Sequence, residues 1–192
     1  KKTLLRHIVF LGAALVTIWI SGYHFGTFDQ VVHIPFLKKL ADPSLYPTDA
    51  FLELRSEHYS FFWLMFIPAY QAGILEPVMF AVHMLVTYSL VWMFWELTKT
   101  LFHNNLANLI SLFLLVFPHF GMPGFQIVEF SLLNRTFVLP FILGAIILYL
   151  RRRYVPAFLL LGIMFNLHVI YVGFTMAMIL FDLLLRLPEV GW

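Results

Sequence analysis

Long apolar runs separated by short polar turns dominate the pattern of this 192-residue chain. A helix needs about 20 largely apolar residues to cross a bilayer, and fewer where neighbouring helices shelter its ends. Six runs approach or meet this length, at residues 8–23, 75–101, 106–120, 128–150, 155–167 and 169–187. The pattern therefore predicts an all-α integral membrane protein with about six transmembrane helices in a single multi-pass domain over residues 1–192.

A further apolar run, at residues 59–67, is short and ends at Pro68. We interpret it as an interfacial helix, because a full span there would invert the direction of every later helix. With a second short helix expected at residues 34–40, the longest polar stretch, residues 26–58, becomes a loop carrying two juxtamembrane helices.

Basic residues give this arrangement a direction. Lys1, Lys2 and Arg6 precede the first run, and Arg151-Arg152-Arg153 follows the run at 128–150. Because Lys and Arg are enriched on the cytoplasmic side of membrane proteins, we expect a cytoplasmic N-terminus in the cell membrane. The loop at 26–58 and any active face are then extracytoplasmic.

Composition agrees with this class. Only 11% of the residues are charged, against about 25% in a typical soluble domain. There is no cysteine, which excludes disulfides, thiolate metal sites and a cysteine nucleophile. The formal charge of +2 does not indicate a nucleic-acid partner. The chain begins without methionine and stops just past an apolar run, as a fragment of a longer protein would.

Several polar residues that could carry chemistry fall on the predicted outer face. Asp29 follows the first run closely, and His33 is one helical turn later, so both would lie on one side of a helix. A carboxylate beside an imidazole can transfer a proton or hold a cation. The alternative is a carboxylate at a helix start with a partnered histidine.

Arg135 lies about one turn below the predicted outer surface, where it could grip a phosphate bidentately or reach to the interface. Glu129 is six residues earlier, about 120° away around a helix, so we predict no direct pairing. His119, Glu129 and His168 fall at outer helix ends and, with His33, are further candidate substrate contacts. His168 could equally be a hydrogen-bonded turn residue.

Other polar positions have structural explanations. Asp42 and Asp49 are expected as turn and helix-cap residues. Glu76, His83 and Thr87 share one stripe of the run at 75–101, which should face the bundle interior. Asp182 and Arg186, four residues apart, should form a local ion pair.

The layout resembles the N-terminal half of the GT-C class of polytopic glycosyltransferases. The resemblance rests on Phe28-Asp29-Gln30, on the two short helices at 34–40 and 53–67 with the turn at 42–49 between them, on residues 130–140 with Arg135, and on Asn166-Leu167-His168. It implies sugar transfer from a polyprenyl-phosphate donor at the extracytoplasmic face, with Asp29 as catalytic base or metal-contacting carboxylate and Arg135 on the donor phosphate. The family often has Asp-Asp or Asp-Glu where this chain has Asp29-Gln30, so a divalent metal stays open.

Two other classes of function compete with this interpretation. A transporter would use the polar stripe as its path, although here the polar groups crowd one surface. A non-catalytic subunit of a larger membrane complex could hold a haem or pigment through His83 or His119. The expected partners are membrane lipids and, in the first interpretation, the lipid-linked donor.

Overall fold

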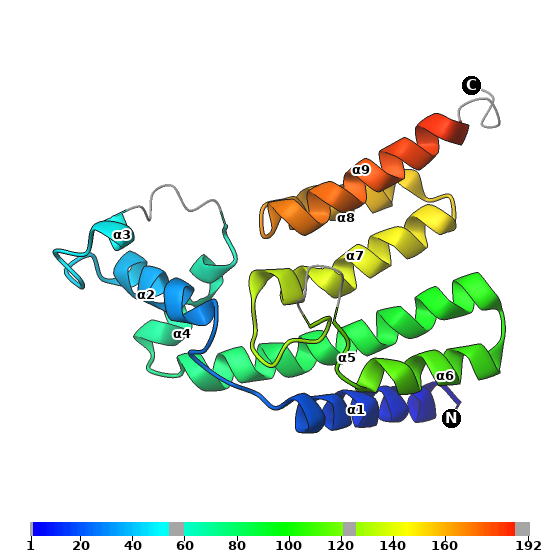
Figure 1. The fold of residues 1–192 in the computed structure, drawn as a ribbon, viewed down its shortest axis with the longest axis horizontal. Coiled ribbons are helices and arrows are strands. Elements are labelled where there is room, and N and C mark those ends of the chain that lie inside the picture. The colour runs from blue at the N-terminus through cyan, green and yellow to red at the C-terminus, as the bar shows by residue number, and fades with distance from the viewer. Residues whose placement is uncertain (1, 54–59, 121–125, 187–192) are drawn as a thin grey trace.

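The computed structural model describes residues 2–53, 60–120 and 126–186, and these ranges are mainly helical (Figure 1). Their only strand-like pairing is an isolated bridge between Phe120 and Gln126. The elements, in chain order, are α1 (Lys2–Ser21), α2 (Gln30–Ala41), α3 (Ala50–Glu53), η2 (Trp63–Phe66), α4 (Ile67–Gln71), α5 (Leu75–Phe102), α6 (Asn105–Val116), α7 (Asn134–Leu150), α8 (Tyr154–Phe165) and α9 (Val169–Arg186).

Three helices in the described ranges are long and apolar enough to cross a membrane, namely α1, α5 and α9. The other three predicted spans are present as shorter apolar helices, α6, α7 and α8, of 12, 17 and 12 residues. Three of the six predicted spans are therefore helices long enough to cross a membrane, and the other three are shorter than predicted. In α6 the cause is Pro118, which forces the preceding residue, Phe117, into extended backbone at ψ 152° and ends the helix.

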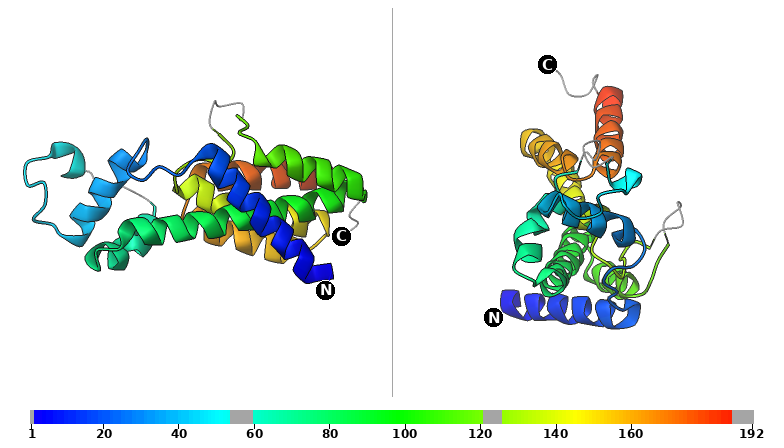
Figure 2. Two further views of the ribbon diagram at one scale, coloured as in Figure 1. Left: turned by 90° about the horizontal axis from the view of Figure 1, so that it is seen from below. Right: turned by 90° about the vertical axis from the view of Figure 1, so that its left-hand side faces the viewer.

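Helix α5 is the central element of the bundle. It packs against α1 and α6 on one side and against α7 on the other (Figure 1), and α7, α8 and α9 pack on one another. Helix α1 crosses α5 obliquely (Figure 2). Buried apolar side chains join these neighbours, with Phe10, Leu90 and Leu112 in one cluster and Val138 and Leu161 in another. Most of the large apolar side chains on α1 and α9 are exposed, as lipid-facing helices require.

The short helices form a separate module around the first turns of α5. Helices α2 and α4 pack together with η2, and their core includes Leu37, Phe62, Trp63, Met79 and Leu132. The first predicted juxtamembrane helix is confirmed as part of α2. The second, expected at 53–67, corresponds to α3, η2 and α4 as far as the structure describes it, because residues 54–59 lie outside the described ranges.

The two ends of the molecule differ in charge. The start of α1 and the C-terminal ends of α5, α7 and α9 lie at the same end of the molecule (right in Figure 1), so Arg6, Lys99, Arg151 and Arg186 belong to what we call the basic end. The opposite, acidic end holds α2, α3 and α4. It also holds the end of α1, the starts of α5 and α7, and the α8–α9 turn.

A tight turn at the basic end connects α5 to α6. His103 takes the left-handed conformation, with φ 51°. Asn104 then caps α6, because its side-chain oxygen accepts hydrogen bonds from Leu106 N at 2.8 Å and Ala107 N at 3.4 Å. The connection between α5 and α6 is therefore short.

Candidate functional site

Arg135, in the first turn of α7, joins two carboxylates from separate parts of the chain. Its Nη1 donates to Asp29 Oδ2 at 2.5 Å, across 106 positions of sequence. Its Nε and Nη2 donate to the two carboxylate oxygens of Glu129, at 2.5 and 3.1 Å. We call these three residues the ion network. The structure therefore brings together the candidate base and the candidate phosphate-binding arginine.

The prediction that Glu129 and Arg135 do not pair is wrong. It assumed that both lie on one helix beginning near residue 128, whereas α7 begins at Asn134. Glu129 belongs to the irregular segment before α7, so helical angles do not apply to it. This segment is held by the α1–α2 connection, because His24 N donates to Phe130 O at 2.8 Å.

A second contact to this segment comes from the side chain of Gln30. Gln30 was not among the candidate residues identified from the sequence. Its side chain is fully buried. Its amide donates to Leu132 O at 2.8 Å and accepts from Gly26 N at 2.7 Å. A signal did exist, since Gln30 precedes the buried Ile34 and Leu37 by four and seven residues, as one helix face does.

The three charged groups differ in their access to the outside. The side chains of Glu129 and Arg135 are 10% and 16% exposed, whereas that of Asp29 is 46% exposed. Burial raises the pKa of Glu129 above its usual range, although the hydrogen bonds and charge of Arg135 oppose the shift. Asp29 is therefore the partner of Arg135 that an incoming ligand meets first.

Asp29 occupies the N-cap position of α2, as expected, but its side chain makes no capping hydrogen bond. The carboxylate is directed to Arg135 instead. His33, one turn later, stacks its ring on Trp63 with centroids 4.9 Å apart. Asp29 and His33 are thus one helical turn apart, as predicted. The ion pair that Asp29 forms is with Arg135.

The turn between α8 and α9 closes the site from another side. Leu167 O accepts hydrogen bonds from Ser60 Oγ at 2.8 Å and from Asn134 Nδ2 at 3.4 Å. The Nδ1 atom of His168 accepts from Tyr171 N at 3.2 Å, so His168 is a hydrogen-bonded turn histidine. Its pKa lies below the usual range because of burial and then the positive charge of Arg135.

His119 does not join this arrangement. It is exposed, and its ring contacts Phe117 O at 2.6 Å in the loop after α6. In the described ranges, no hydrogen bond or ion pair connects it to the ion network. It lies just past the end of α6, but its contribution to a shared site has no support in the geometry.

The positions given structural explanations mostly behave as expected. Asp42 accepts from Ser44, and Asp49 accepts from Phe51 N and Leu52 N at the start of α3. Asp182 and Arg186 pair at 2.9 Å. His83 and Thr87 are buried, but Glu76 is exposed, so the predicted inward stripe is wrong for Glu76 because it lies at the very start of α5. No group of three or more potential metal ligands occurs among the described residues.

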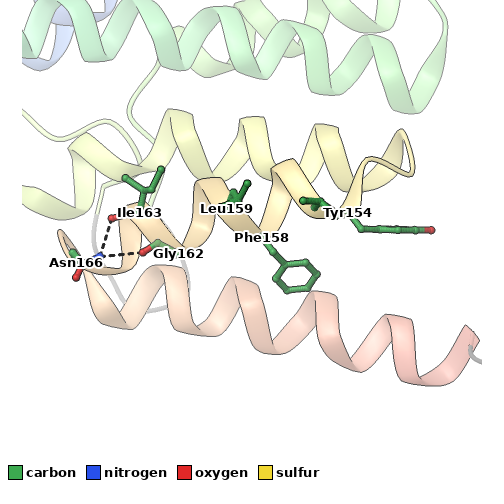
Figure 3. Close-up of a pocket in the computed structure, with 7 residues that line it drawn as sticks. Tyr154, Phe158, Leu159, Gly162, Ile163 and Asn166 are labelled. Carbon is green, nitrogen blue, oxygen red and sulfur yellow. Dashed lines mark hydrogen bonds between the residues drawn. The ribbon is translucent and has the colours of Figure 1, made fainter.

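An apolar groove of about 590 Å³ runs along the exposed face of α8 (Figure 3). Its lining extends from Tyr154 through Leu159 and Ile163 to Asn166. Asn166 immediately precedes Leu167, which is bonded to Asn134 beside Arg135. The groove thus follows an apolar helix whose C-terminal end adjoins the residue that Asn134 bonds.

Comparison with models of protein families, with curated proteins and with solved structures gives no significant match.

Proposed function

We propose that the chain is part of a GT-C-like glycosyltransferase that moves a sugar from a polyprenyl-phosphate donor to an acceptor hydroxyl at the extracytoplasmic face. The observation that carries this proposal is the contact between Asp29 and Arg135. It places a half-exposed carboxylate and a phosphate-binding type of side chain at one end of a set of apolar helices. The resemblance drawn from the sequence supports the same assignment of roles.

The unequal exposure of the ion network suggests how the two roles could alternate. Glu129 holds Arg135 from the buried side through two hydrogen bonds, and Asp29 holds it from the exposed side through one. A donor phosphate would replace Asp29 on the guanidinium, since phosphate matches the same fork geometry. The released Asp29 carboxylate would then be available to the acceptor.

The chemical step follows from these positions. Asp29 accepts the proton of the acceptor hydroxyl as its oxygen forms a bond to the anomeric carbon of the sugar. The bond between that carbon and the lipid phosphate oxygen breaks, and the phosphate leaves with the electron pair. Arg135 stabilises the charge that develops on the leaving phosphate.

The groove on α8 supports a lipid-linked donor over a soluble one. It is apolar, it faces outward from the helices, and it ends near the ion network. An isoprenoid chain in this groove would place its phosphate at the acidic end. The collection of basic residues at the other end is what the positive-inside rule expects of a cytoplasmic side, and it supports an extracytoplasmic site.

The test compares two variants with separate expected defects. Purified protein is supplied with polyprenyl-phosphate mannose or polyprenyl-phosphate glucose and a mixed acceptor fraction from the membrane. Asp29→Asn should lower transfer by roughly 10²–10⁴-fold, the range for loss of general acid–base catalysis, with little change in binding of polyprenyl phosphate. Arg135→Lys should weaken that binding, because the bidentate fork is lost.

Asp42→Asn is the matched control, since Asp42 is an exposed carboxylate of the same loop whose hydrogen bonds, within the described residues, are to Ser44. It should retain transfer. A folded Asp29→Asn protein with unimpaired transfer would exclude Asp29 as the base. Failure of polyprenyl phosphate to bind the unmodified protein would exclude the whole proposal.

A further inference from the structure

A polar cavity of about 420 Å³ lies at the basic end, far along the helices from the ion network. It is lined by residues of α5, the α5–α6 turn, α6 and the end of α7, namely Lys99, Thr100, His103, Asn105, Asn108 and Arg151. The volume is in the range of small-ligand sites. Two cationic and several neutral polar side chains thus surround one space.

The two cationic side chains that line this cavity differ in whether a carboxylate of the protein balances their charge. Arg151 Nη2 contacts Glu96 Oε2 at 3.3 Å and Thr100 Oγ1 at 3.2 Å, so one carboxylate partly balances it. Lys99 is exposed and forms no ion pair within the part of the chain that the structure describes. Arg152 and Arg153 follow directly and add positive charge. The cavity therefore favours an anion.

Asn108 adds a second, independent indication of a ligand. It lines the cavity but is only 2% exposed, and its Oδ1 is closed to solvent and has no hydrogen-bond partner among the described residues. Buried polar atoms are almost always satisfied by protein, water or ligand, so a rotation of this amide toward the cavity would bring its acceptor oxygen to a donor on a ligand. A phosphodiester alone carries no donor, whereas a hydroxyl group does.

The surroundings of the cavity indicate where such a ligand comes from. Leu101, Phe102, Leu106 and Leu109 flank it in sequence, and their side chains are more than half exposed, at 51%, 60%, 64% and 54%. Apolar side chains beside a basic pocket at a helix end match the two parts of a phospholipid, with tails against the first and a head group in the second.

We propose that this cavity binds the head group of an anionic phospholipid whose phosphodiester carries a free hydroxyl, as in phosphatidylglycerol. Lys99 and Arg151 hold the phosphate, and Asn108 accepts a hydrogen bond from the head-group hydroxyl. The proposal does not depend on the glycosyltransferase assignment, because it uses neither the ion network nor the α8 groove.

The experiment measures retention of three lipids by the purified full chain, using native mass spectrometry. Phosphatidylethanol has the same diester charge as phosphatidylglycerol but no free hydroxyl, and phosphatidylcholine is zwitterionic. Retention should fall in the order phosphatidylglycerol, phosphatidylethanol, phosphatidylcholine, with about fivefold between the first two for one hydrogen bond. Equal retention of phosphatidylglycerol and phosphatidylcholine would overturn the proposal.

Variants separate the local site from general charge. Lys99→Gln should weaken both anionic lipids about fivefold, the value of one basic residue near a membrane surface. Arg153→Gln removes the same charge at the same end but does not line the cavity, and it should change retention less than twofold. Equal effects of the two substitutions would show that the lipids respond to the overall positive charge of the basic end, and would overturn the proposal of a local site.

Asn108→Leu should remove the preference for phosphatidylglycerol over phosphatidylethanol and leave phosphatidylethanol retention unchanged. Asn108→Asp keeps an acceptor oxygen and should keep the preference, which separates loss of the hydrogen bond from loss of packing. Soluble glycerol phosphate should not displace the lipid at millimolar concentration. Its displacement of phosphatidylglycerol would assign the cavity to a free phosphate ester and overturn the lipid assignment.

Discussion

Two arginines at opposite ends of the molecule have similar partners and different surroundings. Arg135 at the acidic end is 16% exposed and contacts two carboxylates, with Glu129 bound through both of its oxygens. Arg151 at the basic end is 49% exposed and contacts one carboxylate, that of Glu96, at 3.3 Å. The first arginine organises a buried network, and the second is a largely solvated charge.

The difference originates in the backbone on which each arginine lies. Arg151 directly follows the last turn of α7, where regular helix geometry sets its position. Arg135 lies in the first turn of α7, and that turn follows a segment held by Gln30 and His24 from the α1–α2 connection. A charged residue in a membrane helix bundle thus forms part of a site where hydrogen bonds join segments that are distant in sequence around it.

The largest expected effect is the loss of Arg135. Arg135→Gln leaves the buried Glu129 carboxylate without its partner, and breaking such a pair typically costs about 3–5 kcal/mol. Arg151→Gln removes an exposed contact and should cost less than about 1 kcal/mol. Unfolding of both variants in detergent micelles, followed by circular dichroism, measures the contrast.

A second substitution sharpens this test. Glu129→Gln in the Arg135→Gln background removes the unpaired charge, so it should recover part of the lost stability. Equal destabilisation by Arg135→Gln and Arg151→Gln would contradict the distinction between the two ends.

The second largest expected effect concerns the hydrogen bonds by which Gln30 holds the segment before α7. Gln30→Ala leaves the buried Leu132 O without its side-chain partner, and a buried unsatisfied group costs about 1–3 kcal/mol. It also removes the hydrogen bond from Gly26 N, which is exposed and can bond to water. Gln71→Ala, at the exposed end of α4, is the matched control and should change stability by less than about 0.5 kcal/mol. Similar unfolding midpoints for the two variants would show that Gln30 does not secure the segment before α7.

The order of the helices could be predicted from sequence, because long apolar runs and the turns between them are local features. The turn and cap residues Asp42 and Asp49 and the Asp182–Arg186 pair are confirmed for the same reason. The grouping of Asp29 with Arg135 at one end also follows from the alternating direction of the spans.

The start of α7 could not be predicted in this way. Polar residues interrupt the apolar run at Glu129, Ser131 and Asn134-Arg135-Thr136, and a helix could start at either Ser131 or Asn134, so hydropathy does not fix the start of α7 at Asn134. The boundary depends on hydrogen bonds from residues about 100 positions earlier. Because the Glu129–Arg135 pairing depends on that boundary, it could not be predicted either.

The smallest expected effect is a pH dependence specific to the acidic end. The pKa of His168 is lowered in the folded protein by burial and by Arg135, so the unfolded chain binds its proton more readily below about pH 6.5. The contribution of neutral His168 to stability is therefore present above this pH and decreases as the pH falls through the unfolded value.

Melting temperatures at pH 7.5 and 5.5 test this expectation. The unmodified protein should lose a few degrees more on acidification than His168→Gln, which cannot take up the proton. His103→Gln, at the exposed α5–α6 turn of the basic end, should retain the full pH response. If His168→Gln loses as much thermal stability on acidification as the unmodified protein, His168 is not a source of this pH dependence.

The shortness of α6 and α8 has a consequence for the surrounding lipid. Twelve residues of α-helix extend about 18 Å, whereas the hydrocarbon core of a typical bilayer is about 30 Å thick. Helices of this length that crossed a bilayer would require local thinning, or flanking polar residues that reach to the interface. If α8 crosses the bilayer, we expect the two leaflets to approach each other along the groove that this helix carries.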